Sequence, residues 1–207
     1  MNKNINIAVV GLGQIGIYLY NELNSKKKEI ENKTGKKIEI VAISAKNKNK
    51  KRKFSINKKI FFKNPLEIFN KKKVDILFEA IGLSDGISKK VVETALKKKI
   101  HVVTPNKALI SKHGNELAKL AEKNNVNLEF EASVAGGIPI LRSIKEGLTT
   151  NKISKVYGIL NGTSNYILSE MENTNQTFLD VLKKAQKLGY AEPGNPKLDL
   201  NGFDAFA

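Results

Sequence analysis

The chain has 207 residues, of which 41% are hydrophobic, and a formal net charge of +16. It is long for one domain and apolar enough for an ordinary packed core. It contains no apolar run near the ~18–20 residues that cross a bilayer, and residues 1–10 lack the apolar region of a signal peptide. Because it has no cysteine, disulfide and thiolate chemistry are excluded. These features predict a cytoplasmic protein outside the membrane.

The positive charge is concentrated in one block. Residues 26–73 carry 18 Lys and Arg against 4 Glu, a net +14 of the total +16. Such a block is typical of nucleic-acid-binding proteins. Here it is rich in Lys and Asn rather than Arg, and its only aromatic residues are Phe54, Phe61, Phe62 and Phe69. We favour a solvated surface without a nucleic-acid partner, and a phosphate-binding face is the alternative.

The first part of the chain alternates between apolar runs and segments with helical spacing. Strands are predicted over residues 5–10, 38–43, 74–80, 100–104 and 128–131. Helices are predicted after the first strand as far as Leu23, then over residues 87–96 and 108–124. Strands that alternate with helices predict an α/β fold with a parallel, doubly wound sheet.

The pattern changes after residue 131. Residues 135–139 (AGGIP) predict a turn. Beyond them the spacing predicts a helix, a strand and two further helices, over residues 140–148, 153–160, 164–173 and 177–188. We therefore expect two domains, over residues 1–134 and 135–207, of which the second is an α+β unit.

Residues 11–16 read GLGQIG, directly after the first predicted strand and at the start of the first predicted helix. In that context Gly11 permits a tight turn, Gly13 lets the backbone approach a pyrophosphate, and Gly16 permits close helix–strand packing. The helix N-terminus offers N–H groups to phosphates. We predict that the whole loop binds a dinucleotide, through Gly11, Leu12, Gly13, Gln14, Ile15 and Gly16. The alternative is a purely structural turn.

The residues after the second predicted strand indicate which dinucleotide is bound. An NAD site usually has Asp or Glu there, bonded to the ribose 2′-hydroxyl. This chain has no acid between Glu39 and Glu67. Ser44 can donate a hydrogen bond, and Lys46 or Lys48 can neutralise a 2′-phosphate. The sequence therefore favours NADP, with NAD as the alternative.

Five segments, in this order, resemble homoserine dehydrogenases. They are residues 11–16 (GLGQIG), 104–108 (TPNKA), 131–139 (EASVAGGIP), 161–168 (NGTSNYIL) and 189–204 (GYAEPGNPKLDLNGFD). The resemblance implies a Rossmann domain for NAD(P) over residues 1–134 and part of a catalytic domain over 135–207. It also implies interconversion of L-aspartate 4-semialdehyde and L-homoserine, in threonine, methionine and isoleucine biosynthesis, by an enzyme that is a homodimer at full length.

The resemblance assigns roles to single residues. Glu192 and Asp204 match substrate-binding carboxylates, which would hold the amino and hydroxyl ends of the substrate, and Asp199 matches a third acid of that site. Lys107 matches a catalytic lysine near cofactor and substrate, and Gly189 is assigned to the cofactor. One departure is GYAEPGNP, which has one residue more than the family's GYAEPDP.

The segment 131–138 is similar to a monovalent-cation site of the family, which usually holds sodium. The implied ligands are the carboxylate of Glu131 and the backbone carbonyls of Val134, Gly136 and Ile138. A glycine-rich turn suits such a site because the carbonyls must converge on one point. The alternative is that the turn serves only as a hinge between domains.

The end of the chain adds an expectation about activity. In the family a second lysine lies four residues after the aspartate that Asp204 matches, a place just after Ala207. We therefore expect a fragment, cut within the catalytic domain, that binds cofactor but is inactive alone. Two other functions stay open. One is another NAD(P)-dependent amino-acid dehydrogenase, and the other is a basic nucleic-acid-binding module with salt-sensitive affinity.

Overall fold

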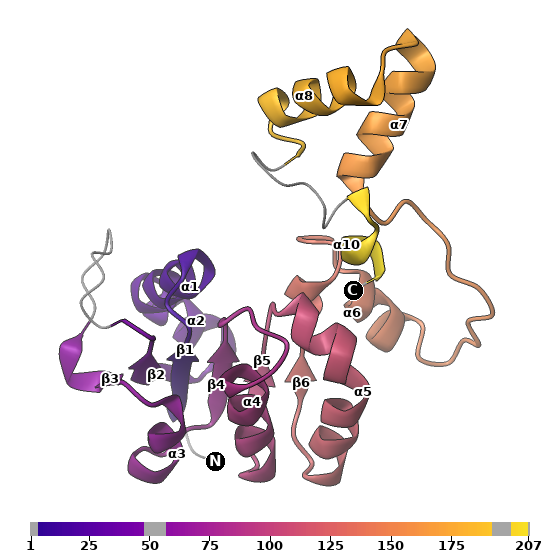
Figure 1. Cartoon of the computed structure of the whole chain (residues 1–207). Coiled ribbons are helices and arrows are strands. Elements are labelled where there is room, and N and C mark those ends of the chain that lie inside the picture. Colours follow the sequence, from indigo (N-terminus) through magenta and orange to yellow (C-terminus); the bar gives the residue numbers. More distant parts are fainter. Residues whose placement is uncertain (1–3, 48–56, 192–199, 207) are drawn as a thin grey trace. The chain divides into compact units, whose positions relative to one another are not determined.

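A computed structural model describes residues 4–47, 57–191 and 200–206 (Figure 1). The chain divides into two compact units, Met1–Ile144 and Lys145–Ala207. The predicted boundary between residues 134 and 135 stays a prediction. None of the helices in the described segments combines the length and the apolar character that crossing a bilayer requires.

The first unit is built on a six-stranded sheet in the order β3-β2-β1-β4-β5-β6, and every neighbouring pair of strands is parallel. The predicted parallel α/β sheet is therefore confirmed. The strands are β1 Asn4–Val10, β2 Lys37–Ser44, β3 Phe61–Phe62, β4 Ile76–Glu79, β5 His101–Val103 and β6 Leu128–Glu129. The strand order reverses direction at β1, where open α/β sheets place their ligands at the carboxyl ends of the strands.

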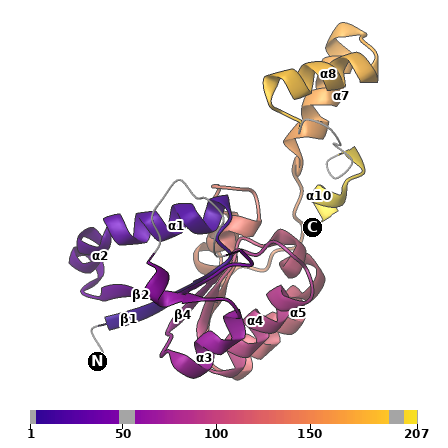
Figure 2. The same cartoon turned by 60° about the vertical axis from the view of Figure 1, so that its left-hand side comes forward.

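Helices cover both faces of this sheet, as a doubly wound fold requires (Figure 2). Helices α1 and α2 lie on one face, and α3, α4 and α5 lie on the other. Their bounds are α1 Gln14–Ser25, α2 Lys27–Thr34, α3 Ile68–Lys71, α4 Ile87–Lys97 and α5 Lys107–Lys123. Short 3₁₀ turns occur at Lys58–Ile60 and Pro65–Glu67.

The alternation of side chains along β1 explains why the sheet has helices on both faces. Ile7 and Val9 pack in an apolar cluster with Tyr20 of α1. Ala8 and Val10 belong to a second, larger cluster formed with α4 and α5. All four β1 side chains are buried. A strand that is apolar at four successive positions therefore needs cover on two sides, which is the usual pattern for a parallel sheet.

The first unit ends in irregular structure that follows β6. A 3₁₀ turn at Glu131–Ser133 leads to the short helix α6, Ile140–Arg142, which continues as a π-helical turn over Ser143–Gly147. The predicted helix over residues 140–148 is thus present in a shorter and less regular form.

The second unit contains the helix pair α7, Gly162–Thr174, and α8, Phe178–Leu188, and the short helix α10, Phe203–Phe206. Ile167 of α7 packs with Val181 and Ala185 of α8 in a small apolar core. Lys184 of α8 also lies 2.6 Å from Glu170 of α7. Both predicted helices are confirmed as this pair.

The predicted strand over residues 153–160 is wrong, because this segment has no regular secondary structure. Its apolar side chains are exposed, with Val156 at 71%, Tyr157 at 87% and Ile159 at 75%. A strand is stabilised by hydrogen bonds to a neighbouring strand, and no described segment pairs with this one. The sequence pattern shows a preference for extended structure but does not supply the partner.

Candidate dinucleotide-binding site

The glycine loop makes a tight turn between β1 and α1. Gly11 has a φ of +94°, and its N–H donates to the carbonyl of Ser44 at 2.9 Å. A Cβ at Gly11 would lie 2.3 Å from the carbonyl oxygen of Ala80, and one at Gly16 would lie 1.8 Å from that of Gly11. Both positions therefore exclude a side chain for reasons of backbone packing.

Gly13 is different, because a Cβ there would have no atom of another segment within 4 Å among the residues that the structure describes. Gly13 is the N-cap residue of α1, and its backbone is extended. As a glycine it makes no side-chain hydrogen bond to the first N–H groups of the helix. The first N–H groups of a helix have no partner within the helix and carry its partial positive charge. The open space at Gly13 is therefore suited to an anionic group such as a pyrophosphate.

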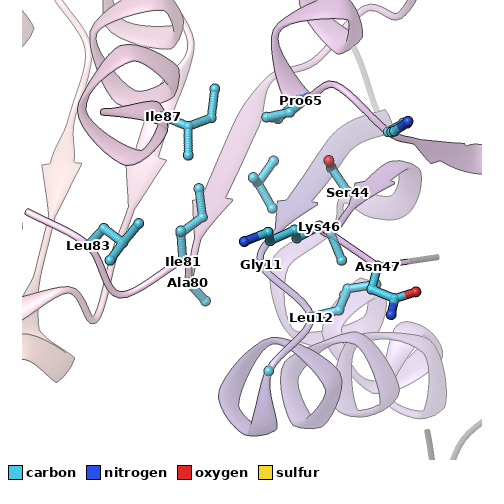
Figure 3. Close-up of a pocket in the computed structure, with 14 residues that line it drawn as sticks. Gly11, Leu12, Ser44, Lys46, Asn47, Pro65, Ala80, Ile81, Leu83 and Ile87 are labelled. Atoms are coloured by element: carbon cyan, nitrogen blue, oxygen red, sulfur yellow. The ribbon is translucent and has the colours of Figure 1, made fainter. Parts of the chain in front are cut away.

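A cavity of ≈ 1040 Å³ lies beside this loop (Figure 3). Its lining comes from the ends of β1, β2 and β4 and from the first residue of α4. Of the predicted cofactor-binding residues, the cavity includes Gly11, Leu12, Gly13, Ser44 and Lys46. It does not include Gln14, Ile15, Gly16, Lys107 or Gly189. The lining residues that sequence reasoning missed are Val10, Ala45, Asn47, Lys63, Pro65, Ala80, Ile81, Leu83 and Ile87.

The charged side chains among the described residues of the cavity are basic. Lys46 and Lys63 line it and are exposed, and Ser44 is buried at the end of β2. Among the described residues that line the cavity, none is acidic. A site of this composition offers cations to a phosphate and no carboxylate to a ribose 2′-hydroxyl. Lys63 escaped prediction because β3, which precedes it, has only two residues and therefore no periodicity.

Lys107 is the first residue of α5 and follows the end of β5 at the carboxyl edge of the sheet. Asn106 caps the helix, since its side chain accepts from the N–H of Leu109 at 3.1 Å. This cap fixes where α5 begins and so fixes the backbone of Lys107. The lysine stays a predicted catalytic residue.

The turn predicted to bind a cation contains two residues in left-handed backbone, Ala135 and Gly136, with φ of +53° and +61°. The carboxylate of Glu131 accepts from the N–H groups of Leu141 at 3.0 Å and Arg142 at 2.8 Å. It therefore caps α6 and is held at the turn. Ile138 is 63% exposed. Within the described ranges, no three His, Cys, Asp or Glu residues gather as metal ligands, so a site here would depend on carbonyl oxygens.

Of the three predicted substrate-binding residues, the structure describes one. Glu192 and Asp199 lie outside the described residues, and Asp204 lies within α10. Gly189 ends α8 in left-handed backbone, with φ of +83°. The roles of these four residues stay predictions.

An exposed ionic cluster ties the loop between β4 and α4 to α5. Asp85 of this loop lies 2.7 Å from the Nζ of Lys112 and 2.9 Å from the Nε2 of His113. It also accepts from the hydroxyl of Ser84 at 2.7 Å. The hydrogen bond from Lys112, followed by those from Ser84 and His113, holds the pKa of the Asp85 carboxyl well below its usual range. The cluster fixes the outer side of a loop whose inner side lines the cavity.

Two family models match the chain. One, described as "Homoserine dehydrogenase, NAD binding domain", matches residues 11–131, and the other, described as "Homoserine dehydrogenase", matches residues 139–207. A homoserine dehydrogenase of Neisseria gonorrhoeae is 44% identical over 203 residues, which are 98% of this chain and 46% of that protein. One of Pseudomonas aeruginosa is 40% identical, with the same two coverages. The chain thus spans about half the length of the curated relatives it matches.

Solved structures give the same result. Homoserine dehydrogenase of S. aureus at pH 8.5 has a TM-score of 0.84 at 40% identity, covering 99% of this chain and 48% of that one. A hyperthermophilic archaeal homoserine dehydrogenase in complex with NADPH shares the fold, with a TM-score of 0.76 at 24% identity, and covers 98% of this chain and 66% of its own. The chain therefore belongs to the homoserine dehydrogenase family, and its sheet unit carries that family's dinucleotide-binding domain.

Proposed function

We propose that the protein is a homoserine dehydrogenase that interconverts L-aspartate 4-semialdehyde and L-homoserine with NADP. The observation that supports the cofactor best is the open space at Gly13, next to a cavity with two lysines and no acid among its described lining residues. The chain spans 46% of the length of these two curated relatives. The activity is therefore proposed from membership of the family.

When bound, the nicotinamide supplies or accepts the hydride. The N-terminus of α1 would bind the pyrophosphate, and Lys46 and Lys63 would neutralise the 2′-phosphate. Lys107 would act near the reacting groups, where a proton must be given to or taken from the substrate oxygen. Glu192, Asp199 and Asp204 would orient the substrate through its amino and hydroxyl groups.

The cation is a separate part of the proposal. Sodium would be held by the carboxylate of Glu131 and the carbonyls of Val134, Gly136 and Ile138. Two successive residues in left-handed backbone support this, since they bend the chain sharply beside the fixed carboxylate. The proposal also includes location in the cytoplasm, a role in threonine, methionine and isoleucine biosynthesis, and a homodimer at full length.

The test begins with titration of the chain with NADPH and NADH. We expect both to bind, NADPH more tightly. Homoserine oxidation is then assayed with residues 1–207 and with any longer form that the gene encodes. We expect turnover only in a form that includes a lysine four residues after Asp204. Equal turnover by residues 1–207 would instead assign the proton transfer to Lys107, and failure to bind either cofactor would refute the proposal.

A further inference from the structure

The carboxylate of Glu79 is fully buried at the carboxyl end of β4. It accepts from the N–H of Ile81 and the hydroxyl of Ser88, each at 2.7 Å from Oε1. The hydroxyl of Thr104 donates to Oε2 at 2.7 Å, and the side-chain amide of Asn106 lies 3.3 Å from the same oxygen. All four of these donors are uncharged groups.

The position of Glu79 explains how the fold tolerates a buried carboxylate without a cation. Ser88 is the second residue of α4, and Asn106 is the N-cap of α5. The carboxylate therefore lies at the positive ends of two helices, where a negative charge is favoured. Burial of a carboxylate costs free energy, which its hydrogen bonds must offset. Glu79 is therefore weak evidence for added stability, and we look for its role in the geometry that these hydrogen bonds impose.

The donors around Glu79 fit a group that only accepts. The backbone N–H of Asn106 donates to the hydroxyl of Thr104 at 3.0 Å, which leaves the proton of that hydroxyl for the carboxylate. The side-chain amide of Asn106 donates to the hydroxyl of Ser88 at 3.0 Å, with the same result there. The N–H of Ile81 belongs to the backbone and cannot reverse, so Oε1 must accept from it. A carboxylate, which only accepts, satisfies all of these donors.

The network joins two structures that face the carboxyl edge of the sheet. The first is the loop after β4, whose residues Ala80, Ile81 and Leu83 line the cavity. Glu79 holds it at the N–H of Ile81, and Asn106 holds it at the carbonyl of Leu83, at 2.9 Å. The second is the start of α5. With its amide nitrogen turned to Glu79, Asn106 must turn its oxygen to the N–H of Leu109, directly beside Lys107.

We propose that Glu79 is a positioning residue, whose acceptor-only carboxylate sets both the cavity wall at Ile81 and Leu83 and the start of α5 at Lys107. This inference rests on the proposed dinucleotide function. It assigns a role to a residue that touches neither the cavity nor the reacting groups, and that acts through Asn106 and the loop backbone.

The decisive variant is Glu79→Gln, which keeps the size and replaces one acceptor by a donor. If the new side-chain nitrogen takes the place of Oε1, it faces the backbone N–H of Ile81, which is also a donor. A donor on the side of Thr104 would oppose the amide of Asn106, which would then flip and lose both its bond to the carbonyl of Leu83 and its cap on α5. We expect the affinity for NADPH to fall about tenfold or more, since a hydrogen bond to a charged group is lost. Glu129→Gln is the matched control, because Glu129 is exposed at the end of β6.

Amide hydrogen exchange, measured by NMR, gives a second readout that does not depend on cofactor. In Glu79→Gln we expect faster exchange at Ile81 and Leu109, with little change at Leu77 and Val102 in the sheet. The double variant Glu79→Gln/Asn106→Asp places an acceptor opposite the new donor and keeps a cap for Leu109. We expect the double variant to bind NADPH about threefold more tightly than Glu79→Gln does. We also expect slow amide exchange at Leu109 to return.

The outcomes separate the two proposals. If the wild type binds NADPH and Glu79→Gln binds it equally well, the positioning role is refuted. Loss of sheet protection at Leu77 with unchanged affinity in the folded fraction would also refute it, since Glu79 would then serve stability alone. Should Glu79→Gln not fold, Thr104→Val removes one donor at equal size and is expected to weaken NADPH binding about threefold. If the wild type binds neither NADPH nor NADH, the proposed function fails, and amide exchange still decides whether Glu79 sets this geometry.

Discussion

The three glycines of the loop at residues 11–16 serve different physical needs. Gly11 and Gly16 leave room for neighbouring backbone, whereas Gly13 borders open space. Only the substitution of Gly13 separates ligand binding from folding, because a Cβ there would have no atom of another described segment within 4 Å.

We expect Gly13→Val to abolish dinucleotide binding and to leave the melting temperature almost unchanged. Gly11→Ala, in contrast, should lower the free energy of unfolding by at least ~1–3 kcal/mol, because it combines a strained φ with a contact to the Ala80 carbonyl. Calorimetric titration and urea unfolding measure the two effects. A Gly13→Val protein that still binds NADPH with native affinity would contradict the assignment of this space to the pyrophosphate.

The choice of cofactor is also decided by single residues. We expect Lys46→Ala/Lys63→Ala to weaken NADPH about tenfold or more and to leave NADH unchanged, because only NADPH carries the 2′-phosphate. Lys72→Ala is the control for general charge, since Lys72 is exposed in the same basic block and does not line the cavity. Equal loss of NADPH and NADH affinity would show that the two lysines do not distinguish the cofactors.

Among the elements, the loop between β4 and α4 contributes to the stability of the fold in a way that depends on pH, through the carboxyl group of Asp85. Its pKa lies below the ordinary value of 3.8, with the hydrogen bond from Lys112 as the largest cause. A carboxyl whose pKa is lower in the folded state stabilises the fold fully above 3.8 and loses that contribution as pH falls through the folded value. We expect Asp85→Asn to melt below the wild type at pH 7 and the two melting temperatures to converge below pH 3.8. A constant difference over this range would exclude the carboxylate as its source.

The turn at residues 131–139 gives a test of the cation. Glu131 caps α6 whether or not an ion is present, so Glu131→Gln lowers the melting temperature in any salt. The specific expectation is a higher melting temperature of the wild type in sodium chloride than in equimolar tetramethylammonium chloride, and a smaller difference in Glu131→Gln. If both proteins respond equally to the change of cation, Glu131 does not hold an ion.

For the whole molecule, most of the cofactor-binding surface should belong to the sheet unit. All described residues that line the cavity, and both apolar clusters of the sheet, lie within Met1–Ile144. We expect a protein of residues 1–144 to bind NADPH within about threefold of the whole chain, by calorimetric titration. A folded protein of these residues without affinity would show that residues 145–207 contribute to the binding site.

The sequence was sufficient where the physical constraint is local. The run INIAVV followed by GLGQIG predicts a buried strand, a tight turn and a helix N-terminus, because each property follows from residues a few positions apart. The same holds for the helices α4, α5, α7 and α8, whose apolar spacing is visible without a partner. The basic residue Lys46 was predicted for the same reason, as it directly follows a long strand.

The tertiary structure decided whatever depends on distant segments. Residues 153–160 have the pattern of a strand, but a strand needs hydrogen bonds from a neighbour that the pattern does not name. Lys63 enters the cavity because β3 pairs with β2. Glu79 meets Ser88, Thr104 and Asn106 because the fold brings the ends of β4 and β5 and the starts of α4 and α5 together. The sequence by itself determined the family and the elements whose pattern is local. The tertiary structure decided which polar groups share one buried site, because that sharing is a property of chain segments far apart in sequence.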